Sequence, residues 1–182
     1  MNIPNLLTLF RISLIPIFIL VFYLPFAKHF LCSAIVFLIA ALTDFLDGYL
    51  ARKLHQSSAL GEFLDPVADK LLVAVALILL VQTDATPWLA LPAAVIVSRE
   101  IVISALREWM AELGKRANVS VSQLGKWKTA FQMIAIILLL AIPVDSNKHL
   151  RTIGYVCIYL ASFLTLWSMV IYLKAAWKDL TR

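Results

Sequence analysis

Long apolar runs, separated by short polar segments, dominate this sequence of 182 residues. An α-helix of about 20 apolar residues crosses the roughly 30 Å hydrocarbon core of a bilayer, and the runs are near that length. Hydrophobic residues make up 62% of the chain, whereas a water-soluble domain is about 45–50% apolar. We therefore predict an all-α, polytopic integral membrane protein with six transmembrane helices, forming one domain over residues 1–182. The apolar runs are 12–27, 29–43, 67–81, 87–97 continuing to 106, 129–144 and 153–173.

Four spans is the alternative count, because the first and fourth runs carry charge. Residues 1–13 (MNIPNLLTLFRIS) have the pattern of a short N-terminal amphipathic helix, which Pro16 either separates from the first span or joins to it through a kink. This segment either anchors the chain at the membrane interface or forms a polar lip over a site. Its polar side chains are Asn5, Thr8 and Arg11. No basic stretch precedes a small-residue cleavage site, so we expect no removed signal peptide.

The distribution of charge predicts the orientation in the membrane. The net charge is +5, and with six spans most Lys and Arg residues lie at the helix ends on the side of the two termini. The exceptions are Lys28, Lys148 and Arg151. Because cytoplasmic segments are rich in Lys and Arg, both termini are predicted to face the cytoplasm. The basic residues are dispersed rather than gathered on a soluble face, which argues against a nucleic-acid partner.

Four aspartates, Asp44, Asp47, Asp65 and Asp69, stand close together in this apolar sequence. A carboxylate at the bilayer centre costs roughly 2.5–3.5 kcal/mol, so a group of four requires neutralisation, most simply by bound cations. Residues 53–58 (KLHQSS) are predicted to form the cytoplasmic loop between the second and third helices. The two pairs of acids then share a site at the cytoplasmic ends of two antiparallel helices.

Carboxylate oxygens favour Mg²⁺, Mn²⁺ or Ca²⁺ over zinc. Four carboxylates suit two divalent ions of the kind that assist phosphoryl transfer. Small residues nearby, Gly48, Ala51 and Gly61, either leave room for a bulky ligand or let two helices pack closely. Arg52 can bind phosphate oxygens through its forked guanidinium group.

The spacing D-x-x-D-G-x-x-A-R, eight residues, G-x-x-x-D-x-x-x-D is matched without departure from Asp44 to Asp69. By this motif the chain resembles the CDP-alcohol phosphatidyltransferase family of integral membrane enzymes. The resemblance implies a six-helix fold, usually a homodimer among membrane lipids, with two Mg²⁺ or Mn²⁺ ions in a site that faces the cytoplasm. The implied metal ligands are Asp44, Asp47, Asp65 and Asp69, of which Asp69 is also the general base. The implied CDP-binding residues are Gly48, Ala51, Arg52 and Gly61.

Stretches outside the motif resemble the bacterial branch of the family that uses glycerol 3-phosphate, namely NIPNLLTLFRI, FLDPVADK, SREIVISALREWMAELGK and LGKWKT. This implies an enzyme of the bacterial cytoplasmic (inner) membrane that transfers the phosphatidyl group of CDP-diacylglycerol to sn-glycerol 3-phosphate. CMP is released, and the product is phosphatidylglycerol phosphate, in the first committed step towards phosphatidylglycerol and cardiolipin. Residues expected to bind the acceptor phosphate are Arg107 and Lys128, followed by Arg99 and Lys126. Alternatively, the two lysines anchor a helix end and the arginines pair with Glu100.

Two other functions compete with this interpretation. A related enzyme could use inositol phosphate, serine or phosphatidylglycerol as acceptor. A cation transporter is the alternative from another class, because carboxylates within membranes also mark ion pathways. Against transport, the acids gather at one membrane face, and no inverted repeat is visible. Elsewhere, Asp84 and Asp145 are expected to be solvated in outer loops, and Cys32 and Cys157 to be packing thiols without a disulfide.

Overall fold

The computed structural model describes residues 3–54, 59–112 and 123–180, in which every regular element is an α-helix. This confirms the predicted all-α class. The second helix continues to Leu54, so Lys53 and Leu54 are helical and do not belong to the loop predicted over 53–58. The helices are α1 (Ile3–Tyr23), α2 (His29–Leu54), α3 (Ala59–Thr83), α4 (Pro87–Glu112), α5 (Gln123–Ala141) and α6 (Lys148–Leu180).

Within the described ranges, four segments are long and apolar enough to cross a membrane. They are Asn5–Tyr23, His29–Asp47, Pro87–Glu112 and Lys148–Lys174. The other two helices differ in composition, since α3 carries Asp65, Asp69 and Lys70 in its first half and the apolar part of α5 is limited to Trp127–Ala141. A membrane protein with at least four apolar helices is therefore established, and six crossings stay a prediction.

The first helix is continuous from Ile3 to Tyr23, so Pro16 does not separate a short amphipathic helix from a first span. Proline lacks an amide hydrogen and usually weakens a helix interior. The residue is exposed on the surface of α1. As a consequence, the polar residues near the N-terminus and the apolar residues that follow belong to one helix.

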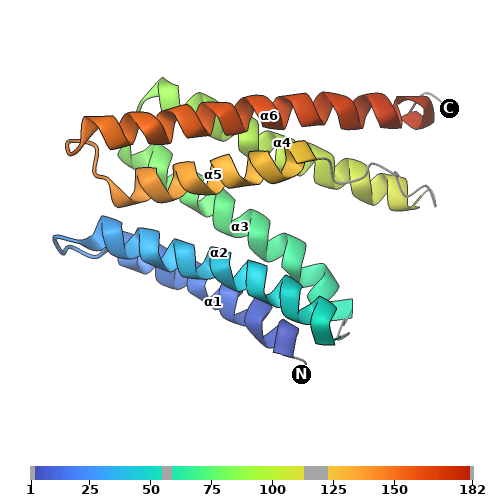
Figure 1. Cartoon of the computed structure of the whole chain (residues 1–182), viewed down its shortest axis with the longest axis horizontal. Helices are drawn as coiled ribbons and strands as arrows, with labels where there is room; N and C mark the ends of the chain where they lie inside the picture. Colours follow the sequence, from blue (N-terminus) through green and yellow to red (C-terminus); the bar gives the residue numbers. More distant parts are fainter. Residues whose placement is uncertain (1–2, 55–58, 113–122, 181–182) are drawn as a thin grey trace.

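The helices form two groups, which meet where α2 packs against α5 and where α3 contacts both groups (Figure 1). α1 and α2 lie side by side, α4, α5 and α6 form the second group, and α3 contacts members of both. The two termini lie towards the same end of the molecule (Figure 1). Because α3 carries two of the motif aspartates, this placement puts them within reach of both groups.

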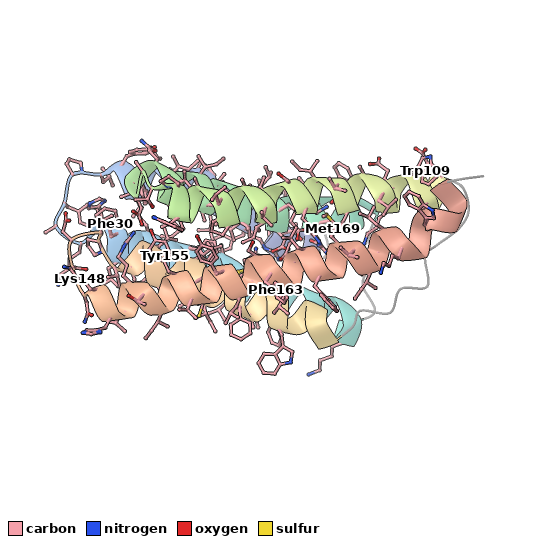
Figure 2. All side chains as sticks on the ribbon, turned by 90° about the horizontal axis from the view of Figure 1, so that it is seen from above. Phe30, Trp109, Lys148, Tyr155, Phe163 and Met169 are labelled. Atoms are coloured by element: carbon pink, nitrogen blue, oxygen red, sulfur yellow. The ribbon has the colours of Figure 1, made fainter. Side chains whose placement is uncertain are left out.

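Apolar side chains fill the space between the helices and also cover the outside. Phe18 and Phe37 are fully buried, and their rings pack 6.1 Å apart between α1 and α2. α5 and α6 pack closely at Gly154, where an added Cβ would lie 2.9 Å from Leu139. Outward residues such as Phe163 on α6 remain exposed (Figure 2). An apolar exterior of this kind suits a lipid environment.

One sequence-based expectation is wrong at the end of the molecule away from the two termini. Asp84 is not solvated: only 5% of it is exposed, and it forms an ion pair with Arg151 and accepts a hydrogen bond from Tyr155. Arg151 also donates to the carbonyl of Ile142 at 2.7 Å. Tyr155 lies at the same end of the molecule as Lys148, opposite Trp109 (Figure 2). Burial of this acid is possible because a cation and a hydroxyl from α6 replace its water.

The remaining expectations for isolated residues agree with the structure. Asp145 is exposed in the link between α5 and α6. Cys32 and Cys157 are free thiols, half-buried and buried respectively. They are therefore packing residues, as predicted.

Candidate active site

The four motif aspartates lie where the end of α2 meets the beginning of α3. Asp44 and Asp47 are one turn apart on α2, and Asp65 and Asp69 are one turn apart on α3. Their environments differ, since 44% of the Asp44 side chain is exposed and only 4% of the Asp47 side chain. The pair on α3 is half-buried. The site is thus open on one side and closed by protein on the other.

The first helix supplies the counter-charge for these acids. Arg11 is completely buried, with Nη1 2.5 Å from Oδ1 of Asp44 and Nη2 in contact with Oδ2 of Asp47. Thr8, almost one turn earlier, donates a hydrogen bond of 2.5 Å to Oδ1 of Asp65. A charge buried to this degree is stable only when it is paired with an opposite charge. The segment predicted as an anchor or a lip therefore touches three of the four motif aspartates.

The donor set has the chemistry of a site for hard divalent cations, because it consists of carboxylate oxygens. Among the described residues, no three acidic, histidine or cysteine side chains are placed as a metal cluster. Arg11 stands between Asp44 and Asp47, where a cation would meet both carboxylates. The position of this guanidinium group shows that the site accommodates positive charge. The carboxylates are also the type of ligand that the expected Mg²⁺ or Mn²⁺ ions prefer.

The predicted nucleotide-binding residues are described only in part. Gly61 is buried at the beginning of α3, four residues before Asp65. Gly48, Ala51 and Arg52 lie on the last turns of α2, and their side chains fall outside the described part of the structure. The same is true of Lys126 near the start of α5. Asn5 is half-buried on α1.

A second polar site lies beside the aspartates. A cavity of about 210 Å³ opens between α3, α4, α5 and α6, and we name it the basic cavity. Three of the predicted phosphate-binding residues, Arg99, Arg107 and Lys128, meet there although they come from two helices. The lining residues are Asp69, Lys70, Val73, Arg99, Glu100, Arg107, Lys128, Thr129, Gln132, Met133, Ser168 and Tyr172.

Glu100 organises two of these cations. Its Oε1 accepts a hydrogen bond of 3.1 Å from Nη1 of Arg99 and another from Nζ of Lys128. Arg99 and Lys128 are both buried, and the Glu100 side chain is 27% exposed. Pairing between Glu100 and the neighbouring cation, which the sequence left as an alternative, is therefore present. It does not remove Arg99 from the cavity, because the same guanidinium group also contacts α6.

Asp69 connects the two polar sites. It lines the basic cavity, and it lies within electrostatic range of Asp44 and Arg11 on one side and of Glu100 and Lys128 on the other. Asp69 belongs to α3, a helix that contacts both groups (Figure 1). A carboxylate at this position can contact groups bound in either site.

Sequence reasoning missed several residues of the basic cavity. Lys70 on α3 donates to Oγ of Ser104, and Ser168 and Tyr172 on α6 contact the arginines. Gln132 enters from α5. Polar residues inside an apolar membrane helix mark functional positions. The presence of Ser168 and Tyr172 in the last apolar run could therefore have indicated a functional site.

The fold and the site together define a helical membrane protein with an acidic cluster beside a basic cavity. The sequence model of the CDP-alcohol phosphatidyltransferase family matches residues 1–171. This chain therefore belongs to the CDP-alcohol phosphatidyltransferase family.

Similar proteins match over nearly the whole chain. A protein of Pseudomonas fluorescens is 57% identical over 181 residues, which cover 99% of this chain and 92% of the relative. A protein of Salmonella typhimurium is 55% identical over 179 residues, which cover 98% of this chain and 97% of the relative. A Shigella flexneri protein is 54% identical with the same coverage. All three are named CDP-diacylglycerol–glycerol-3-phosphate 3-phosphatidyltransferase.

Proposed function

We propose that this enzyme transfers the phosphatidyl group from CDP-diacylglycerol to sn-glycerol 3-phosphate, giving phosphatidylglycerol phosphate and CMP. The names of the relatives, which are 54–57% identical over nearly the full chain, support this reaction. The observation that carries it is the position of Asp69, which lines the basic cavity and is also close enough to the motif residue Asp44, and to its partner Arg11, for their charges to interact. A general base for an acceptor hydroxyl must reach both the acceptor and the reacting phosphate.

The charge of the basic cavity favours a phosphate monoester as acceptor. Its lining contains four cations and two carboxylates, which leaves a net charge of +2. A phosphate monoester carries about −1.5 to −2 at pH 7. Serine has no net charge and phosphatidylglycerol is a diester with a single negative charge, so both match the cavity less well. Inositol phosphate matches it equally in charge, and the names of the relatives favour glycerol 3-phosphate over it.

The reaction follows from this arrangement. The cations of the basic cavity hold the acceptor phosphate, which leaves its free terminal hydroxyl to approach Asp69. The carboxylate of Asp69 takes the hydroxyl proton, and the oxygen attacks the phosphorus attached to diacylglycerol. The bond from that phosphorus to the bridging oxygen breaks, and the electron pair leaves with CMP. Arg52, with Gly48, Ala51 and Gly61, is proposed to hold the CDP group.

We further propose that Asp44, Asp47, Asp65 and Asp69 hold two Mg²⁺ or Mn²⁺ ions. Such ions neutralise the diphosphate and stabilise the charge that develops on the attacking and leaving oxygens. The carboxylate chemistry of the donor set supports this proposal, as does the cationic Arg11 between two of the acids. With ions held there, Arg11 would still pair with Asp44 and Asp47, and Thr8 would still donate its hydrogen bond to Asp65.

We also propose that the enzyme is a homodimer in the bacterial inner membrane. Each chain would cross the membrane six times, and its site would face the cytoplasm. The helices run alternately between the two ends of the molecule, with both termini at one end (Figure 1). An even number of crossings agrees with this arrangement. The excess of Lys and Arg at that end favours the cytoplasm.

The proposed function is tested by measuring CMP release from CDP-diacylglycerol by the purified protein in detergent with Mg²⁺. Glycerol 3-phosphate, inositol phosphate, serine and phosphatidylglycerol are offered in turn, and EDTA and Asp69→Asn serve as controls. We expect release with glycerol 3-phosphate alone, abolished by both controls. Release with another acceptor would contradict the assignment of the basic cavity, and ion transport without any CMP release would favour a transporter.

A further inference from the structure

Two neutral side chains of α6 hold the arginines of the basic cavity. The ring of Tyr172 lies against both guanidinium groups, with Cζ of Arg99 5.8 Å and Cζ of Arg107 5.2 Å from the ring centroid. Nη2 of Arg107 also donates to the hydroxyl of Tyr172 at 3.0 Å. One turn earlier, Oγ of Ser168 accepts a hydrogen bond of 2.9 Å from Nη2 of Arg99 and donates one to the carbonyl of Thr165.

These contacts orient the two arginines without cancelling their charge. A carboxylate in the same place would hold the guanidinium groups but would neutralise them. An aromatic ring attracts cations through its quadrupole, and a hydroxyl oxygen accepts a hydrogen bond while remaining neutral. The positive charge of Arg107 therefore remains available to an anion, whereas Arg99 shares its charge with Glu100 through Nη1. Nε of Arg99 is buried and has no hydrogen-bond partner among the described residues.

We infer that Tyr172, assisted by Ser168, is a positioning residue for the phosphate of the acceptor. Two like charges repel each other, and without a fixed contact their flexible side chains would need to be ordered when the anion binds. The ring of Tyr172 fixes both groups before binding, which lowers that entropic cost. This inference rests on the proposed function, because it concerns the same cavity. It adds that α6, which carries none of the motif residues, contributes to acceptor affinity.

The test compares Tyr172→Phe, which keeps the ring and loses the hydroxyl, with Tyr172→Leu, which loses both. Tyr159→Leu is the matched control, because Tyr159 also lies on α6 but bonds to the carbonyl of Trp88 in the first turn of α4. For each protein we would measure the KM for both substrates, the Kd of inorganic phosphate by calorimetry and the Tm in detergent. We expect the KM for glycerol 3-phosphate and the phosphate Kd to rise about threefold in Tyr172→Phe and about tenfold in Tyr172→Leu.

The KM for CDP-diacylglycerol and the Tm should stay at the wild-type value in both Tyr172 variants, and Tyr159→Leu should leave phosphate binding unchanged. An unchanged phosphate Kd in Tyr172→Leu would overturn the inference. Equal rises in both KM values together with a lower Tm would also overturn it, since they would indicate a merely structural role. If the wild-type protein released no CMP with any acceptor, the proposed function would fail, and the phosphate titration alone would decide the role of Tyr172.

Discussion

Arg11 is the residue on which the electrostatics of the aspartate site depend most directly. It is completely buried, and its guanidinium group contacts the carboxylates of Asp44 and Asp47. Its position explains how the two acids are accommodated on neighbouring turns of α2, because like charges there would otherwise repel. If the proposed metal ions bind there, Arg11 and the ions would neutralise the same carboxylates.

We predict that Arg11→Met lowers the free energy of unfolding by about 3–5 kcal/mol in EDTA, because it removes the cation that contacts the buried carboxylate of Asp47. Saturating Mg²⁺ should raise the Tm of this variant more than it raises the Tm of the wild type, since the cation then replaces the lost charge. Thermal unfolding in detergent with EDTA or Mg²⁺ measures both effects. Equal Mg²⁺ shifts in the two proteins would mean that Arg11 and the metal do not share the carboxylates.

Within the basic cavity, Lys128 and Glu100 are predicted to have separable effects on stability and on acceptor binding. Lys128→Met removes one partner of a buried ion pair, so the Tm should fall and the KM for glycerol 3-phosphate should rise about tenfold. The double variant with Glu100→Gln restores the net charge of the cavity and removes the carboxylate that has lost one of its two cationic partners. Because the two residues are in contact, the double variant should be about 0.5–3 kcal/mol more stable than the sum of the two single substitutions predicts.

The KM of the double variant should nevertheless remain raised, because the amino group of Lys128 is still missing. Unfolding and steady-state kinetics on the same preparations give the comparison, with Glu100→Gln alone as the control. A KM that returned to the wild-type value would show that only the net charge of the cavity matters.

At the scale of the helices, the ion pair between Asp84 and Arg151 ties the end of α3 to the first turn of α6. Each side chain is at most 8% exposed, so Asp84→Asn should destabilise the protein by about 3–5 kcal/mol. Both KM values should be unchanged, since the pair lies at the end of the molecule away from Asp69. Chemical unfolding in detergent gives the stability, and Asp145→Asn, at an exposed position, is the control that should change nothing. A raised KM for either substrate would show that the two ends of the bundle are coupled.

The helices and the motif could be predicted from the sequence, whereas the contacts between helices could not. The apolar runs and the beginning of α3 at Ala59 follow from local pattern and spacing. That Arg99, Arg107 and Lys128 share one site follows only from the family resemblance and the charge of the expected acceptor. A helix that is apolar on all sides gives no signal for the face that it turns towards its neighbours. For that reason the partnership of Arg11 with the motif acids could be offered only as one of two possibilities.

Asp84 and Tyr172 show the same limit. Asp84 stands beside a turn and has the sequence context of a solvated loop residue, but its partners Arg151 and Tyr155 are on α6, far along the chain. Tyr172 reads as one of many aromatic residues in the last apolar run. Its role near two arginines depends on the rotation of α6 about its axis, which only the packed structure specifies.

For the whole molecule, the arrangement of the helices and the distribution of charge predict which end faces the cytoplasm. Ser146, between α5 and α6, and Glu112, the last residue of α4, are both exposed and lie at opposite ends of the bundle. In a Cys32→Ser and Cys157→Ser background, a cysteine at position 146 should react with a membrane-impermeant maleimide on intact spheroplasts. A cysteine at position 112 should react only after the membrane is permeabilised.

This labelling pattern is expected because Lys and Arg gather at the end of the molecule that carries both termini, and such ends stay in the cytoplasm. The reverse labelling pattern would place the aspartates on the outer face, where cytoplasmic CDP-diacylglycerol headgroups and glycerol 3-phosphate could not reach Asp69. Labelling of both positions from outside would contradict the alternating path of the helices, and with it the six crossings.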